Sequence, residues 1–168
     1  MNSTATAPHS HTALISGSIS LKAEMAECYA ELAEQLENCN NSEAATTFHL
    51  LAQHQQQHVQ ELEILAADLD LSQLSPLTFN VDQESPADDI NANSHYLMTP
   101  YHAVELALNV EQSTLKALLS RIDMEKDLHS PHQQEHAQHI QTLRQLLSTL
   151  PQPDNHWDED LDPPNLDD

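Results

Sequence analysis

The sequence predicts an all-α protein, an antiparallel four-helix bundle with a long crossover between its second and third helices. Of the 168 residues only one is Gly and 4% are aromatic, whereas strands and their turns need Gly and aromatic or β-branched residues. Four stretches repeat apolar residues at helical spacing, and the connections between them are short, long and short. We expect a disordered arm over residues 1–17, the bundle over 18–150 and a disordered acidic tail over 151–168.

The first predicted helix runs over residues 18–38 and carries a lysine on its inward face. Its apolar stripe consists of Leu21, Met25, Tyr29, Leu32 and Leu36. Lys22 lies on this stripe, seven residues before Tyr29, and is one of only five basic residues in the chain. A lysine so close to a helix start usually extends its ammonium out of the core.

The second predicted helix runs over residues 43–69 and follows a short turn, with Ser42 as its N-cap. It is therefore an antiparallel neighbour of the first helix. Gln55 and His58 interrupt its apolar stripe at mid-length. His49 and His54 point elsewhere and are assigned to the surface.

A connection of about thirty residues follows, which is unusual inside a compact domain. In a bundle its reason is a crossover, which lets the second and third helices run parallel. Thr99 and Pro100 suit the N-cap and first position of a third helix over residues 100–126. Glu111 stands at the centre of its apolar stripe, and a buried carboxylate needs a cation or a hydrogen-bond donor.

The fourth predicted helix, over residues 131–150, directs histidines at the core. His132, His136 and His139 share a stripe with Ile140, Leu143, Leu147 and Leu150. A single inward histidine is commonly a core residue with its hydrogen bonds satisfied. Three on one stripe favour a ligand function, because a buried imidazole needs hydrogen-bond partners or a metal.

The formal charge of −22 and the sequence pI near 4.5 make nucleic acid and anionic membrane surfaces poor partners. With neither a signal peptide nor a long apolar run in sequence, we expect a cytoplasmic location. The acidic tail is a candidate for binding a protein partner through Trp157, Leu161 and Leu166, and we expect a homodimer.

Each predicted helix thus brings a polar residue to the middle of the core, and the spacing of these residues resembles the rubrerythrin branch of the ferritin-like superfamily. In that branch a Glu precedes a Tyr by seven residues, and two helices carry Glu-x-x-His pairs. Here the matching positions, within residues 18–150, are Lys22 and Tyr29, Phe48, Leu51, Ala52, Gln55 and His58, Ala107 and Glu111, and His136, His139 and Leu143. The resemblance implies a ferritin-like bundle with a metal-binding function related to iron or oxidative stress.

The chain departs from this ligand pattern at three of six positions, where glutamates are replaced by Lys22, Gln55 and His136. Two iron ions need several carboxylates to balance and bridge them, so a full di-iron centre and its usual chemistry are not expected. The three unchanged ligands, His58, Glu111 and His139, together with the substituted His136 form a set that suits one Fe, Zn or Cu ion. Tyr29 and Gln55 would act as hydrogen-bond donors behind these ligands.

A second interpretation stays open beside the metal site. In this interpretation Lys22 pairs with Glu111 and supplies the positive charge that a metal ion would bring, while Gln55 and the imidazoles complete a polar network. The protein is then a metal-free bundle that acts as a structural or partner-binding module. Catalytic residues are not assigned, and whether the protein is an enzyme stays open.

Overall fold

The computed structural model describes residues 6–68, 85–120 and 131–158, with side chains over 15–68, 85–117 and 134–158. Over these ranges the chain is helical without strands, which confirms the predicted all-α class. Its helices are α1 (Thr6–Asn38), α2 (Ser42–Ala66), α3 (Pro86–Ala92), α4 (Pro100–Ser120) and α5 (Pro131–Thr149). No described helix combines the length and hydrophobicity that crossing a membrane would need.

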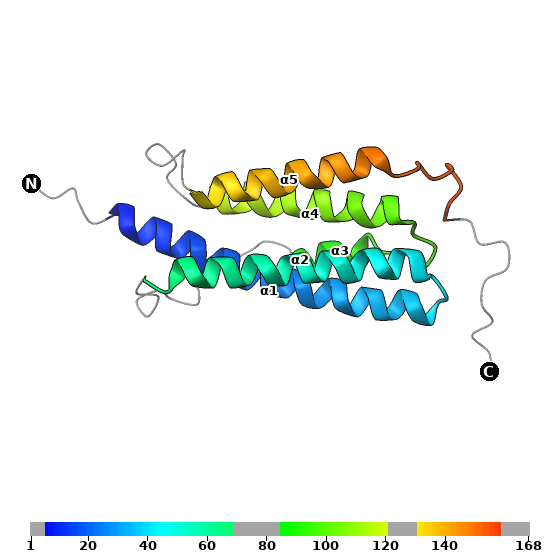
Figure 1. Ribbon diagram of the computed structural model, residues 1–168, viewed down its shortest axis with the longest axis horizontal. Helices are drawn as coiled ribbons and strands as arrows, with labels where there is room; N and C mark the ends of the chain where they lie inside the picture. Colours follow the sequence, from blue (N-terminus) through cyan, green and yellow to red (C-terminus); the bar gives the residue numbers. More distant parts are fainter. Residues whose placement is uncertain (1–5, 69–84, 121–130, 159–168) are drawn as a thin grey trace, which may run out of the picture.

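Two antiparallel helical hairpins, α1 with α2 and α4 with α5, lie side by side in Figure 1. Helices α2 and α4 run in the same direction, as the predicted crossover between them requires. The most extensive packing is within the hairpins, α1 against α2 and then α4 against α5. The apolar core includes Met25, Phe48, Val104 and Leu143, which are all at most 3% exposed.

Helix α1 begins twelve residues earlier than predicted. It starts at Thr6 rather than near Ser18, so the prediction of a disordered arm is wrong for residues 6–17, while 1–5 lie outside the described residues. The physical reason is that Ile15 is buried at 2% exposure and extends the packed face toward the N-terminus. Pro8 does not break the helix because it lies in the first turn, where its missing N–H is not needed.

The turn between α1 and α2 is organised by two asparagines. Asn40 has φ of 60°, in the left-handed region that Asn tolerates better than most residues. Asn41, rather than the predicted Ser42, caps α2 by accepting a hydrogen bond from the Ala44 amide at 3.2 Å. Its Nδ2 donates to the backbone oxygens of Tyr96 at 2.9 Å and Met98 at 2.7 Å. Asn41 therefore ties this turn to the segment that leads into α4.

The described part of the crossover contains α3, a short helix that the sequence pattern did not predict. Ser85 caps it by accepting from the Ala87 amide at 3.1 Å, and its hydroxyl also donates to a carboxylate oxygen of Glu24 on α1. Ile90 is fully buried and belongs to the main core. The crossover is thus anchored on α1 by both a polar and an apolar contact.

The beginning of the predicted disordered tail packs on the bundle. The Trp157 ring lies 3.8 Å from the ring of His102 and 5.4 Å from that of His95, measured between centroids. Trp157 is partly buried against the core, so it does not project as a free docking residue. Leu161 and Leu166 lie outside the described residues, as do the predicted ends of α2 at 69 and of α4 at 126.

Candidate functional site

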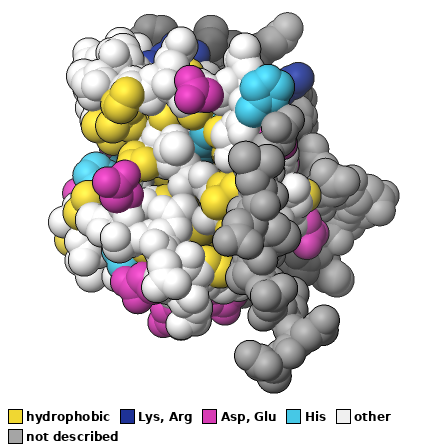
Figure 2. All heavy atoms as spheres, turned by 90° about the vertical axis from the view of Figure 1, so that its right-hand side faces the viewer, with side chains coloured by type: hydrophobic (Ala, Val, Ile, Leu, Met, Phe, Trp, Pro, Cys, Tyr) yellow, Lys and Arg dark blue, Asp and Glu magenta, His cyan; other side chains and the backbone are white. Residues whose placement is uncertain are grey.

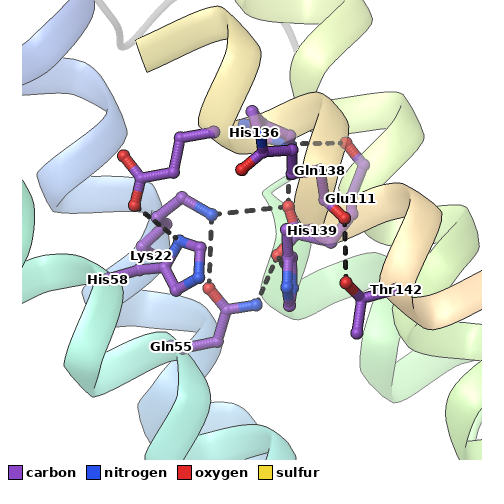
Figure 3. A network of polar contacts seen from close by, with 9 residues as sticks. Lys22, Gln55, His58, Glu111, His136, Gln138, His139 and Thr142 are labelled. Carbon is purple, nitrogen blue, oxygen red and sulfur yellow. Dashed lines mark hydrogen bonds and ion pairs between the residues drawn. The ribbon is translucent and has the colours of Figure 1, made fainter. Parts of the chain in front are cut away.

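Five buried polar side chains meet in the middle of the bundle (Figure 3), with α1, α2 and α4 supplying one each and α5 supplying two. They are Lys22, Gln55, Glu111, His136 and His139, with exposed fractions between 0% and 5%. Each replaces an apolar residue on the inward stripe of its own helix, so packing the stripes together brings the polar groups together. The convergence follows from helical spacing on four separate helices.

A buried ion pair lies at the centre of this network. The Lys22 ammonium is 3.5 Å from Oε2 of Glu111 and 3.5 Å from Oε1 of Gln55. The Gln55 amide in turn donates to Oε1 of Glu111. The lysine side chain is 2% exposed, so it does not extend its charge to solvent as a lysine near a helix start usually does.

Both imidazoles of α5 approach the same carboxylate. Nε2 of His136 is 2.8 Å from Oε2 of Glu111 and 3.3 Å from its backbone oxygen. Nε2 of His139 is 3.4 Å from Oε1 of Glu111 but is not aligned for a hydrogen bond. Burial alone would raise the pKa of Glu111; interaction with the two histidines and the charge of Lys22 outweigh it and hold that pKa well below its ordinary value.

His58, the sixth predicted residue, lies at the rim of the network, with its side chain 12% exposed. Its Nδ1 is 3.6 Å from Oε1 of Glu135, and its ring centroid is 4.7 Å from that of His139. Burial, followed by the charges of Lys22 and His139, lowers the pKa of His58 to about 4. The imidazole is therefore neutral at pH 7 and has a lone pair to offer.

Tyr29 was predicted to donate a hydrogen bond to the site. The side chain is fully buried and packs on Phe48 with ring centroids 5.8 Å apart. Its hydroxyl has no hydrogen-bond partner among the described residues, and burial with the nearby Glu111 charge raises its pKa well above the ordinary value. Tyr29 is thus a neutral phenol beside the network. The side chain of His132 lies outside the described residues.

Sequence reasoning missed two rim residues, His54 and Glu135. His54 is exposed, as predicted, but its ring also stacks on that of His139 at 5.6 Å and lies 6.1 Å from that of His58. The available signal was its spacing of four residues before His58, which puts both rings on one helical face. Glu135 is hydrogen-bonded to Glu61; burial, then this bond and the Glu61 charge, raise its pKa to about 7.

A pair of iron ions does not fit the central site. Of the residues that the structure describes, only Glu111 offers a carboxylate there, and it is engaged by Lys22, Gln55 and His136. A buried ammonium 3.5 Å from this carboxylate repels an added cation. Two other groups in the described chain have donor atoms within 4.8 Å of one another, close enough to hold an ion: His54 with His58 and His139, and His58 with Glu61 and Glu135.

No protein-family model matches the sequence, and no curated protein matches it. Among solved structures, the chain is similar to the crystal structure of an uncharacterized conserved protein from Magnetospirillum magnetotacticum MS-1. The sequences are 26% identical, the match covers 84% of this chain and 95% of that one, and the TM-score is 0.53. With the helix arrangement described above, this likeness supports a ferritin-like helical bundle.

Proposed function

We propose that this protein is a ferritin-like bundle whose central site has changed from a metal centre to an internal ion pair, and that it works as a non-enzymatic structural or partner-binding module. The observation that supports this most directly is the buried Lys22 ammonium, 3.5 Å from the Glu111 carboxylate. It provides in the chain itself the positive charge that a metal ion would otherwise supply. Di-iron oxygen or peroxide chemistry is therefore not the function we propose.

Electrostatics argue against adding a metal ion beside Lys22. At 4 Å and an effective dielectric constant near 20, two like charges repel by about 4 kcal/mol, so a divalent ion would face roughly twice that. The ion would also have to displace the donors that Gln55 and His136 direct at Glu111. A metal bound by Glu111, His136, His139 and His58 remains a hypothesis that must overcome both costs.

The acidic side chains at one end of the bundle form no single patch. Figure 2 shows Asp and Glu side chains scattered over this end, with apolar and uncharged groups between them. A net charge of −22 keeps a protein soluble and disfavours anionic partners. It supports a binding or structural function more than recognition of one acidic or phosphorylated ligand.

Iron binding by untagged protein tests this proposal. Wild-type protein equilibrated with Fe²⁺ without oxygen should not bind an iron pair, and should not consume oxygen when it is admitted. The double variant Lys22→Glu/Gln55→Glu restores carboxylates at two family positions and should gain iron, because the ammonium is gone and bridging oxygens are present. Lys116→Glu, which makes the same Lys-to-Glu change at an exposed position of α4, is the control.

Two iron ions per wild-type chain, lost in Glu111→Gln, would overturn the proposal. A single ion that persists in Glu111→Gln lies outside the central site and leaves the proposal intact. The wild-type measurement decides the matter even where the double variant does not fold.

A further inference from the structure

Three histidines outside the ion pair form a compact cluster at the rim of the central network. His54 and His58 come from consecutive turns of α2, and His139 comes from α5. One ring nitrogen of each lies within 4.8 Å of those of the other two. Figure 3 shows His58 and His139 side by side at this place, between α2 and α5.

The spacing of these nitrogens is close to what a single metal ion requires. Zinc–nitrogen bonds of 2.0–2.1 Å in a tetrahedron put ligand nitrogens about 3.4 Å apart. From at most 4.8 Å, the rings reach this spacing by small side-chain rotations. His54 is exposed and free to make them, and two histidines four residues apart on a helix are a spacing that zinc sites use.

An independent observation points to a ligand at the same place. His139 is 5% exposed, and within the described chain its Nε2 is buried without a hydrogen-bond partner. Leaving a polar nitrogen in this state costs free energy, and coordination of a cation by this nitrogen would offset that cost. Oε1 of Glu111 is 3.4 Å from the same nitrogen, and its negative charge would favour a cation there.

We infer that His54, His58 and His139 bind one divalent ion of the kind that prefers imidazole, namely Zn²⁺, Ni²⁺ or Cu²⁺. Three imidazole ligands leave the fourth position of a tetrahedral ion to water or a small ligand. The ion would not use Glu111 as a ligand. The neighbouring Lys22–Glu111 pair carries no net charge, so it opposes an ion at the rim less than Lys22 opposes one bound at Glu111 itself. This inference goes beyond the proposed function and does not depend on it.

The carboxylate-rich neighbouring group is the competing location. Glu61 and Glu135 share His58 with the histidine cluster. Imidazole nitrogens suit Zn²⁺, Ni²⁺ and Cu²⁺, whereas carboxylate oxygens suit Mg²⁺, Ca²⁺ and Mn²⁺. An ion of the first kind therefore favours the three histidines.

Calorimetric titration of untagged protein with ZnCl₂, after removal of metals by a chelator, tests the inference. Wild-type protein should bind one Zn²⁺ per chain. His54→Ala should weaken binding by about tenfold or more, since one of three ligands is lost. His49→Ala should bind as wild type does, because this histidine is also exposed on α2 but pairs with Glu37 at 3.1 Å.

Glu135→Gln separates the two locations and should leave Zn²⁺ affinity close to that of wild type. The inference is overturned if wild-type protein does not bind Zn²⁺ or if His54→Ala binds it with unchanged affinity. It is also overturned if Glu135→Gln loses binding while His54→Ala keeps it. A second measurement does not rely on variants: in histidine-labelled protein, the ring resonances of His54, His58 and His139 should shift on adding Zn²⁺, while those of His49 should not. The iron experiment above concerns Glu111, so each proposal can fail alone.

Discussion

Replacing Glu111 by Gln should destabilise the bundle strongly, because it removes the negative charge beside a buried ammonium and changes little else in size or shape. The side chains of Lys22 and Glu111 are 2% and 0% exposed. Breaking a buried ion pair by removing one partner costs about 3–5 kcal/mol. Gln55 Oε1 still accepts from Lys22 in the variant, which places the expected loss toward the lower end of that range.

Urea unfolding measures the effect, with and without a chelator. For an m value near 2 kcal/mol/M, a loss of about 3 kcal/mol moves the midpoint by roughly 1.5 M. The loss should be the same in both conditions, since Lys22 and not a metal provides the charge. Glu105→Gln, at a partly exposed position of α4, is the control and should change stability little.

A second substitution tests the cause. Lys22→Met in the Glu111→Gln background removes the unpaired ammonium and should recover at least about 2 kcal/mol, because neither charge is then buried alone. The reasoning is refuted if Glu111→Gln costs less than about 1 kcal/mol or if Lys22→Met gives no recovery. A loss seen only without chelator would instead support a metal bound at Glu111.

Two further predictions concern the rim and the helix turn. The raised pKa of Glu135, about 7 against an ordinary 4.5, means that its carboxyl favours the folded state at low pH and loses this contribution as the pH rises from 4.5 through 7. Measured with a chelator present, Glu135→Gln should therefore raise the Tm relative to wild type more at pH 8 than at pH 5. An equal rise at both pH values would contradict this cause, and so would the same response in the exposed control Glu63→Gln. Asn41→Ala removes the α2 cap and two hydrogen bonds to the segment before α4, and should lower the free energy of unfolding in urea by about 1–3 kcal/mol. A loss no larger than that of the exposed control Asn91→Ala would show that these three hydrogen bonds contribute little.

The fold and the centre of the site could be predicted from the sequence for the same reason. Lys22, Gln55 and Glu111 each interrupt an apolar stripe, and a stripe states which face of a helix turns inward. The connection lengths then fix the order and direction of the helices. Nothing in such a pattern distinguished a buried ammonium from one that extends to solvent, because that depends on the side chains of the other helices.

The rim of the site could not be predicted in the same way. His54 and Glu135 lie outside the inward sectors of their own helices, and they matter only because α2 and α5 approach each other there. The early start of α1 is a different case, since Ile15 is buried seven residues before Lys22 and continues the same inward face. The cap at Asn41 instead of Ser42 is a shift of one residue, within the ordinary uncertainty of helix ends.

The buried lysine also changes when the site becomes complete. A metal centre is finished only after an ion has been captured, so the fraction of folded protein depends on how much free metal surrounds the chain. Lys22 is synthesised with the polypeptide and lies opposite Glu111 as soon as the two hairpins close. The central site is therefore complete without a cofactor, whether metal is scarce or abundant, and an ion bound by the rim histidines would add to the stability of a bundle that has already closed.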